Sequence, residues 1–153
     1  MKTIRQVNLD QTDMKQFAAC LADCVILTHD GKILMQRRPE NWGSYPGVVN
    51  IFGGHVEEGE SVVAGLLREL NEELGAVVQP DDLIFIGAVS EDITNHTEIV
   101  HVYFWHDKDQ SITGCYEAEP IMFENVALAL AHPKIMDYAA WALMECRRSG
   151  LIS

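Results

Sequence analysis

The segment spanning residues 53–76, GGHVEEGESVVAGLLRELNEELGA, carries the clearest helical pattern in the chain. Its apolar side chains recur at intervals of three and four residues, which predicts an amphipathic helix over 61–74. Ser61 suits the N-cap position, because its hydroxyl can accept a hydrogen bond from a free backbone N–H of the first turn. Gly75 suits a left-handed C-cap. The segment therefore supplies one well-bounded helix around which the rest of the fold is placed.

Three carboxylates on this helix conflict with its hydrophobic pattern. At about 100° per residue, Glu73 lies within the apolar stripe, and Glu69 and Glu72 flank it. A lone carboxylate is costly to bury, the C-terminal half of a helix disfavours negative charge, and like charges three or four residues apart repel. A divalent cation resolves all three conflicts, and clustered hard oxygen ligands suit Mg²⁺ or Mn²⁺. The alternative interpretation is a solvated acidic face.

The residues before the helix favour the cation interpretation. Gly53 and Gly54 allow the backbone to approach another group closely, so that a glycine carbonyl can serve as an additional oxygen ligand. A plain turn explains the glycine pair equally well when it is taken alone. We also expect Glu60 to pair with Arg68 and to fix the shape of the intervening loop.

The arrangement of these residues resembles the signature of the Nudix hydrolases, over residues 54–76. Gly54, Glu60 and the run RELNEELG at 68–75 match every charged and glycine position of that signature. Ala76 departs from it, since the family usually has a larger aliphatic residue there, at a packing position. Val49 and Phe52 stand where the family often has Trp and Pro, which weakens assignment to the branch that removes oxidised nucleoside triphosphates.

The resemblance implies an enzyme that hydrolyses a diphosphate linkage in a nucleoside diphosphate derivative or a nucleoside triphosphate. Mg²⁺, or alternatively Mn²⁺, is the implied cofactor, since divalent cations neutralise the diphosphate and acidify the attacking water. Arg68 is implied to orient the carboxylates. The implied metal ligands are the Gly54 carbonyl and the side chains of Glu69, Glu72 and Glu73.

The general base varies within the family, between a helix glutamate and a glutamate of a later loop. Glu119 is our first choice here, ahead of Glu117 and Glu69. Arg37 and Arg38 are candidates for binding a substrate phosphate, because paired guanidiniums suit that role; a surface pair that balances nearby acids is the alternative.

Trp42 and Tyr45 lie in the loop after this arginine pair. They are able to stack on a nucleotide base or to anchor the loop.

Two other functions remain open at this stage. The first is an isoprenoid diphosphate isomerase, whose fold is similar; those enzymes have a reactive cysteine shortly before the glycine pair, and residues 41–54 contain none. The second is a non-catalytic nucleotide sensor on the same scaffold. Sensors of that kind tend to lose carboxylates, and this chain keeps them all, so hydrolysis is the favoured interpretation.

Outside the signature, short apolar runs alternate with turn residues, which favours an α/β fold. A second helix is expected at 134–148, and strands at 4–7, 18–28, 33–36, 48–52, 83–89, 99–105 and 121–123. Strands on both sides of a mid-chain helix predict a mixed sheet with helices on both faces, and the resemblance implies a Nudix-type α/β/α sandwich. We expect a single domain over 1–153, with residues 1–16 as an N-terminal extension.

The composition excludes several functional classes. Of the 153 residues, 11 are Lys or Arg and 23 are Asp or Glu, which gives a formal net charge of −12, with 48% hydrophobic residues. This acidic balance disfavours binding to a nucleic acid polymer. No apolar run is long enough to span a membrane, and the polar N-terminus lacks the core of a signal peptide. The four cysteines have no zinc spacing, which favours reduced thiols in a cytoplasmic protein. The sequence does not decide the oligomeric state, and it is compatible with a homodimer through a sheet edge or the N-terminal segment.

Overall fold

The computed structural model of the protein describes residues 3–41, 43 and 45–153. Its strands form one eight-stranded sheet in the order β1-β6-β7-β2-β3-β4, with β5 paired to β2 and β8 paired to β3. The strands are β1 (Ile4–Gln6), β2 (Ala19–Leu27), β3 (Ile33–Arg37), β4 (Val49–Asn50), β5 (Phe52–His55), β6 (Ile84–Glu91), β7 (Glu98–His106) and β8 (Glu119–Phe123). The α-helices are α1 (Val62–Leu74), α2 (Val126–Leu130) and α3 (Asp137–Arg148).

Strand β2 organises the sheet. It pairs with β7 in parallel over its whole length, whereas the other strand pairs are antiparallel, so the sheet is mixed as predicted. Its other edge is shared between two strands: β5 pairs with it as far as Cys24, and β3 pairs with it from Ile26. The sheet therefore forks at Val25.

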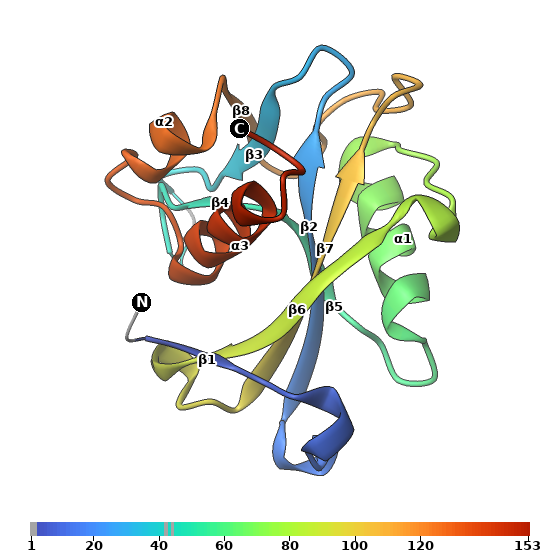
Figure 1. The fold of residues 1–153 in the computed structure, drawn as a ribbon, viewed down its shortest axis with the longest axis vertical. Coiled ribbons are helices and arrows are strands. Elements are labelled where there is room, and N and C mark those ends of the chain that lie inside the picture. Colours follow the sequence, from blue (N-terminus) through green and yellow to red (C-terminus); the bar gives the residue numbers. More distant parts are fainter. Residues whose placement is uncertain (1–2, 42, 44) are drawn as a thin grey trace.

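Helices cover both faces of this sheet, which confirms the predicted α/β/α sandwich (Figure 1). Helix α1 packs its buried leucines on one face, and alternate residues of β2 point toward it, including Ala22 and Cys24. Helix α3 packs on the other face, where Val25 of β2 contributes to a second core. Because side chains alternate along a strand, Asp23 belongs to the α3 face.

Both predicted caps of α1 are present. The Ser61 hydroxyl accepts a hydrogen bond from the Ala64 N–H at 3.1 Å, and Gly75 ends the helix with a φ of 65°. Glu73, which was predicted to lie in the apolar stripe, is only 3% exposed. The amphipathic pattern therefore set the orientation of the helix correctly.

Three elements differ from the sequence-based expectation. Helix α3 begins at Asp137 rather than near Lys134, because residues 134–136 run beside β4: the Val49 N–H donates to the Lys134 carbonyl and the Met136 N–H donates to the Val49 carbonyl, each at 2.9 Å. Helix α2 was not predicted, since its five residues are too few to show a helical period. The single strand expected at 48–52 is two strands, β4 and β5, which are separated at Ile51; β5 continues through both glycines.

The N-terminal residues 4–6 form the expected strand and extend the sheet beside β6. Cys20, Cys24, Cys115 and Cys146 are all free thiols. Within the described residues, every helix is too short or too polar to cross a lipid bilayer.

Candidate active site

The two glycines of β5 lie between acidic side chains from both faces of the sheet. In the pairing of β5 with β2, Gly53 is opposite Asp23 and Gly54 is opposite Ala22. A Cβ atom on Gly53 would overlap the Ala22 carbonyl oxygen and the Asp23 carboxylate. A Cβ atom on Gly54 would lie 2.6 Å from the carboxylate carbon of Glu69. Only glycine leaves room at these positions for carboxylates to approach so closely.

Glu73 is the most deeply buried carboxylate of this group. Its Oε1 accepts a hydrogen bond from the Gly53 N–H at 3.0 Å. Burial, together with the nearby charges of Asp23, Glu69 and Glu117, raises the pKa of Glu73 to about 9, although the bond from the Gly53 N–H acts in the opposite direction. A buried carboxylate surrounded by like charges is unstable in its ionised form unless a cation accompanies it.

Glu69 lies one turn earlier on α1 and is largely buried. Burial raises its pKa, the adjacent Arg68 lowers it, and the charges of Glu72 and Glu117 raise it. Glu72 is half exposed and lies 3.4 Å from the nearest Arg68 nitrogen. The exposure of the three helix glutamates thus increases from Glu73 through Glu69 to Glu72. This agrees with the helical periodicity, which placed Glu73 in the apolar stripe and the other two beside it.

Arg68 links the helix to the preceding loop. Its Nε and Nη2 donate to the two Glu60 oxygens at 2.8 and 3.0 Å, which confirms the predicted pair. Nη2 also donates to the His55 carbonyl at 3.0 Å, and Nη1 donates to Glu69 at 3.0 Å. The guanidinium lowers the pKa of Glu60 to about 2. Arg68 therefore fixes the Glu69 carboxylate relative to the end of β5.

Asp23 completes the group and was not predicted from the sequence. It is 3% exposed, and its Oδ2 accepts a hydrogen bond from the Tyr138 hydroxyl at 2.5 Å. Burial raises its pKa to about 7, although the bond from Tyr138 acts in the opposite direction. The available signal was a single acid in the apolar run ACLADCVIL of β2.

The two loop glutamates have different surroundings. Glu119 begins β8, opposite Arg37 of β3, and accepts a hydrogen bond from Arg37 Nη1 at 2.7 Å. Arg37 also pairs with Glu40 at 3.0 Å. Glu117 lies in the preceding loop, where its charge acts on Glu69 and Glu73. The structure therefore groups Glu117, rather than our first choice Glu119, with the helix carboxylates.

The other predicted substrate-binding residues lie in the loop after β3. The Arg38 N–H donates to the Val48 carbonyl and its carbonyl accepts from the Gly47 N–H, each at 2.9 Å, so its backbone closes this loop. Tyr45 lines a cavity at the start of α3. Trp42 lies outside the described residues.

The donor chemistry of the site fits a divalent cation. Carboxylate oxygens are the ligands that Mg²⁺ and Mn²⁺ prefer, and a cation relieves the mutual repulsion that raises the pKa values of Glu69 and Glu73. In their present positions, no three Asp, Glu, His or Cys side chains of the described residues converge closely enough to bind one ion. Binding of one ion by three of them would require these side chains to rotate.

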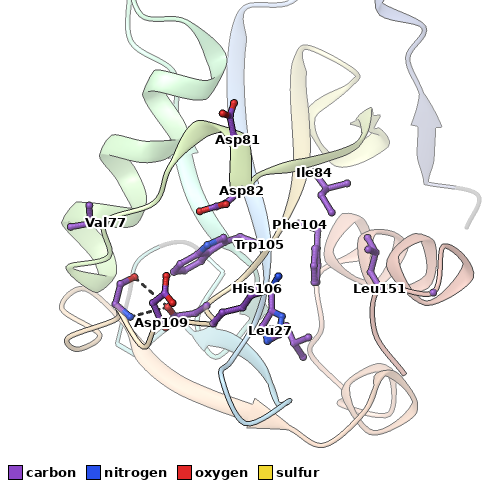
Figure 2. Close-up of a pocket in the computed structure, with 14 residues that line it drawn as sticks. Leu27, Val77, Asp81, Asp82, Ile84, Phe104, Trp105, His106, Asp109 and Leu151 are labelled. Atoms are coloured by element: carbon purple, nitrogen blue, oxygen red, sulfur yellow. Dashed lines mark hydrogen bonds between the residues drawn. The ribbon is translucent and has the colours of Figure 1, made fainter.

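Two cavities have different relations to this site. The larger, about 490 Å³, lies at the C-terminal ends of β2 and β7, around Trp105 and His106 (Figure 2). None of the acidic residues around the two glycines lines it. The second, about 400 Å³, lies between the N-terminal segment and α3; Glu91, whose charge acts on Asp23, lines it together with Met136. Side-chain chemistry, rather than cavity size, therefore locates the candidate site.

Comparison with known proteins agrees with the resemblance seen in residues 54–76. The profile of the NUDIX domain matches residues 21–142. The CTP pyrophosphohydrolase of Escherichia coli K12 is 29% identical over 109 residues, which cover 71% of this chain and 77% of that protein. The oxidized purine nucleoside triphosphate hydrolase of Danio rerio is 31% identical over 104 residues, covering 68% of this chain and 60% of that protein.

Two further relatives extend the comparison. An uncharacterized Nudix hydrolase of Clostridium acetobutylicum is 31% identical over 93 residues, covering 56% of this chain and 45% of that protein. This match and the Danio rerio match thus span less than two thirds of those relatives. The crystal structure of a MutT protein from Methanosarcina mazei superposes with a TM-score of 0.71 at 22% identity, covering 90% of this chain and 99% of that one.

A family profile that spans most of the chain, together with a shared fold, confirms the resemblance to the Nudix hydrolases. The chain belongs to the NUDIX domain family.

Proposed function

We propose that the protein is a divalent-cation-dependent pyrophosphohydrolase that cleaves a diphosphate linkage in a nucleoside triphosphate or a nucleoside diphosphate derivative. The observation that carries the proposal is the burial of Glu73 against Gly53, with Asp23, Glu69 and Glu117 close enough to raise its pKa. A fold seldom tolerates several like charges around one buried carboxylate unless they serve a cation.

In this proposal the Gly54 carbonyl and the side chains of Glu69, Glu72 and Glu73 hold the ion, either Mg²⁺ or Mn²⁺. The ion supplies positive charge for the diphosphate oxygens and lowers the pKa of the attacking water. Arg68 acts as a positioning residue, because its guanidinium group donates hydrogen bonds to Glu60, the His55 carbonyl and Glu69 at once.

We propose Glu117 as the general base. A base must lie within reach of the attacking water and must itself be able to ionise. Glu117 is exposed and acts electrostatically on both Glu69 and Glu73, whereas Glu119 is paired with Arg37. Arg37 remains a candidate for binding a substrate phosphate, because an anion can exchange with the carboxylates that now surround its guanidinium.

The names of the two enzyme relatives support a nucleotide substrate: one is a CTP pyrophosphohydrolase and the other acts on oxidized purine nucleoside triphosphates. The cavity of about 400 Å³ beside Glu91 and Met136 suits the nucleoside part, because its walls are predominantly apolar. A small-molecule nucleotide is thus the proposed partner.

The test is a substrate panel assayed for phosphate and pyrophosphate release after treatment with EDTA, with and without added Mg²⁺ or Mn²⁺. The panel contains nucleoside triphosphates, their oxidised purine forms, ADP-ribose, nucleotide sugars and dinucleoside polyphosphates. We expect cation-dependent turnover of at least one class, and a loss of at least about 100-fold in Glu73→Gln.

Glu145→Gln is the matched control, because Glu145 lies on α3 and pairs with Arg148, away from the site. Its rate should equal that of the wild type. Binding of a nucleotide without turnover would contradict the proposal and indicate a sensor. Equal turnover by Glu73→Gln would remove the proposed role of the buried carboxylate.

A further inference from the structure

Asp23 is a buried acid that the NUDIX signature does not contain. It lies on the α3 face of β2, whereas Glu69 and Glu73 reach the glycine pair from α1, on the opposite face. The two sets of carboxylates meet only because Gly53 and Gly54 carry no side chains. An Asp in a buried strand is destabilising unless its surroundings compensate. Its position therefore calls for a functional explanation.

Tyr138 fixes the orientation of Asp23. The Tyr138 hydroxyl donates to Asp23 Oδ2 and accepts from the Asn50 side-chain amide at 2.6 Å. The Asn50 side-chain oxygen in turn accepts from the Ile51 N–H at 2.8 Å. Burial raises the pKa of Glu91 to about 7, and the nearby backbone N–H of Tyr138 acts in the opposite direction. The Tyr138 hydroxyl is thus fixed by its bonds with Asn50 and Asp23, so it leaves Asp23 little freedom to turn.

Gly53 is the point at which this network reaches the helix carboxylates. The Asp23 carboxylate occupies the space where a Gly53 side chain would lie, and the Gly53 N–H donates to Glu73. A displacement of Asp23 therefore frees the Gly53 peptide to move, and a displaced peptide no longer holds Glu73.

We propose that Asp23, oriented by Tyr138, is a positioning residue of the active site that fixes the Gly53 peptide, and with it the Glu73 carboxylate, from the α3 face of the sheet. This inference rests on the proposed function for its catalytic meaning, but its geometric content is independent of any reaction. The competing explanation is that Asp23 only satisfies the buried Tyr138 hydroxyl.

The first test measures amide hydrogen exchange of Gly53 by NMR in the protein without metal. Tyr138→Phe removes only the hydroxyl, and Asp23→Asn keeps the size of the side chain but removes its charge. We expect each to increase the exchange rate of the Gly53 amide about tenfold, relative to the mean change in β2 and β7. Tyr103→Phe is the control, because Tyr103 is a partly buried tyrosine of β7 that packs on Phe85 instead. Unchanged Gly53 exchange in both variants would overturn the proposal.

The second test measures Mn²⁺ binding by electron paramagnetic resonance. We expect Asp23→Asn and Tyr138→Phe to weaken binding about fivefold each, and the double variant to bind no more weakly than Asp23→Asn alone, since Tyr138 acts through Asp23. Full additivity, or binding equal to that of the wild type in both single variants, would contradict the inference.

Glu73→Gln separates the two proposals. Loss of Mn²⁺ binding in Glu73→Gln with normal binding in Asp23→Asn and Tyr138→Phe would refute only the role of Asp23. Normal Mn²⁺ binding in Glu73→Gln would refute the proposed cation site, while the exchange of the Gly53 amide still decides whether Asp23 positions that peptide.

Discussion

Replacing Glu73 with Gln is expected to stabilise the metal-free protein while it abolishes hydrolysis. Burial, with the charges of Asp23, Glu69 and Glu117, raises the pKa of Glu73 from 4.5 to about 9, so at pH 7 the folded chain holds it protonated. The unfolded chain ionises it at its ordinary pKa. Folding must therefore take up a proton, which costs about 1.4 kcal/mol per pH unit above 4.5, or about 3 kcal/mol at pH 7.

Gln is neutral and nearly isosteric, and its side-chain oxygen can still accept the Gly53 N–H. We therefore expect Glu73→Gln to increase the free energy of unfolding by about 3 kcal/mol at pH 7 in EDTA. The sign follows from the raised pKa: the difference between variant and wild type is small below pH 4.5, grows as pH rises, and levels off above about pH 9. Under the proposed cation site, added Mg²⁺ should reduce or reverse this difference, because it would stabilise only the protein that keeps the Glu73 carboxylate.

Urea unfolding at pH 5, 7 and 8.5, monitored by tryptophan fluorescence, measures this difference. Glu72→Gln is the matched control, since Glu72 lies on the same helix but is half exposed, and its effect should stay within about 0.5 kcal/mol at each pH. The reasoning is refuted if Glu73→Gln in EDTA is no more stable than the wild type at pH 8.5, or if its advantage does not change with pH.

Three further predictions concern the glycines, the helix cap and the arginine fork. Gly53→Ala should lower the free energy of unfolding in urea by more than about 3 kcal/mol, because its Cβ would overlap the backbone of β2. Gly59→Ala should lower it by about 1 kcal/mol, because Gly59 has a φ of 82° but open space around it. Similar losses in the two variants would contradict the packing described for Gly53. Ser61→Ala should lose about 1 kcal/mol in thermal unfolding with an unchanged rate per folded molecule, and a larger loss of rate would give the cap another role. Arg68→Lys should lower kcat about tenfold with little change in KM, because lysine lacks the planar guanidinium that bonds to both Glu60 and Glu69. A rise in KM alone would mean that Arg68 binds substrate directly.

Local patterns predicted the helix of the site well. The spacing of apolar residues along α1 placed Glu73 in the core, and both caps and the pair of Glu60 with Arg68 follow from contacts within a few turns of chain. Such contacts lie within the helix or the few residues that lead into it, where local geometry is regular enough to be predicted from a sequence. The resemblance to the NUDIX signature rests on this same segment.

Contacts between segments that are distant in the sequence could not be predicted from local patterns. Asp23 faces Gly53 because of the register between β2 and β5, and Tyr138 reaches Asp23 across 115 positions of sequence. Glu117 and Glu119 differ by only two residues, yet one lies in a loop and the other is paired with Arg37 by the register of β8. Register is set by the assembled sheet, so it has no signal within any one strand.

The fork of the sheet at Val25 has a consequence for how this protein can diversify. The first half of β2 holds β5 and the acidic side chains, and the second half holds β3, which carries β4 and β8 and the loop that begins at Arg38. Lengthening that loop, or exchanging its residues, leaves the alignment of Asp23 with Gly53 intact. Under the proposed function, substrate preference can thus change on one branch while the acidic side chains on the other keep their arrangement.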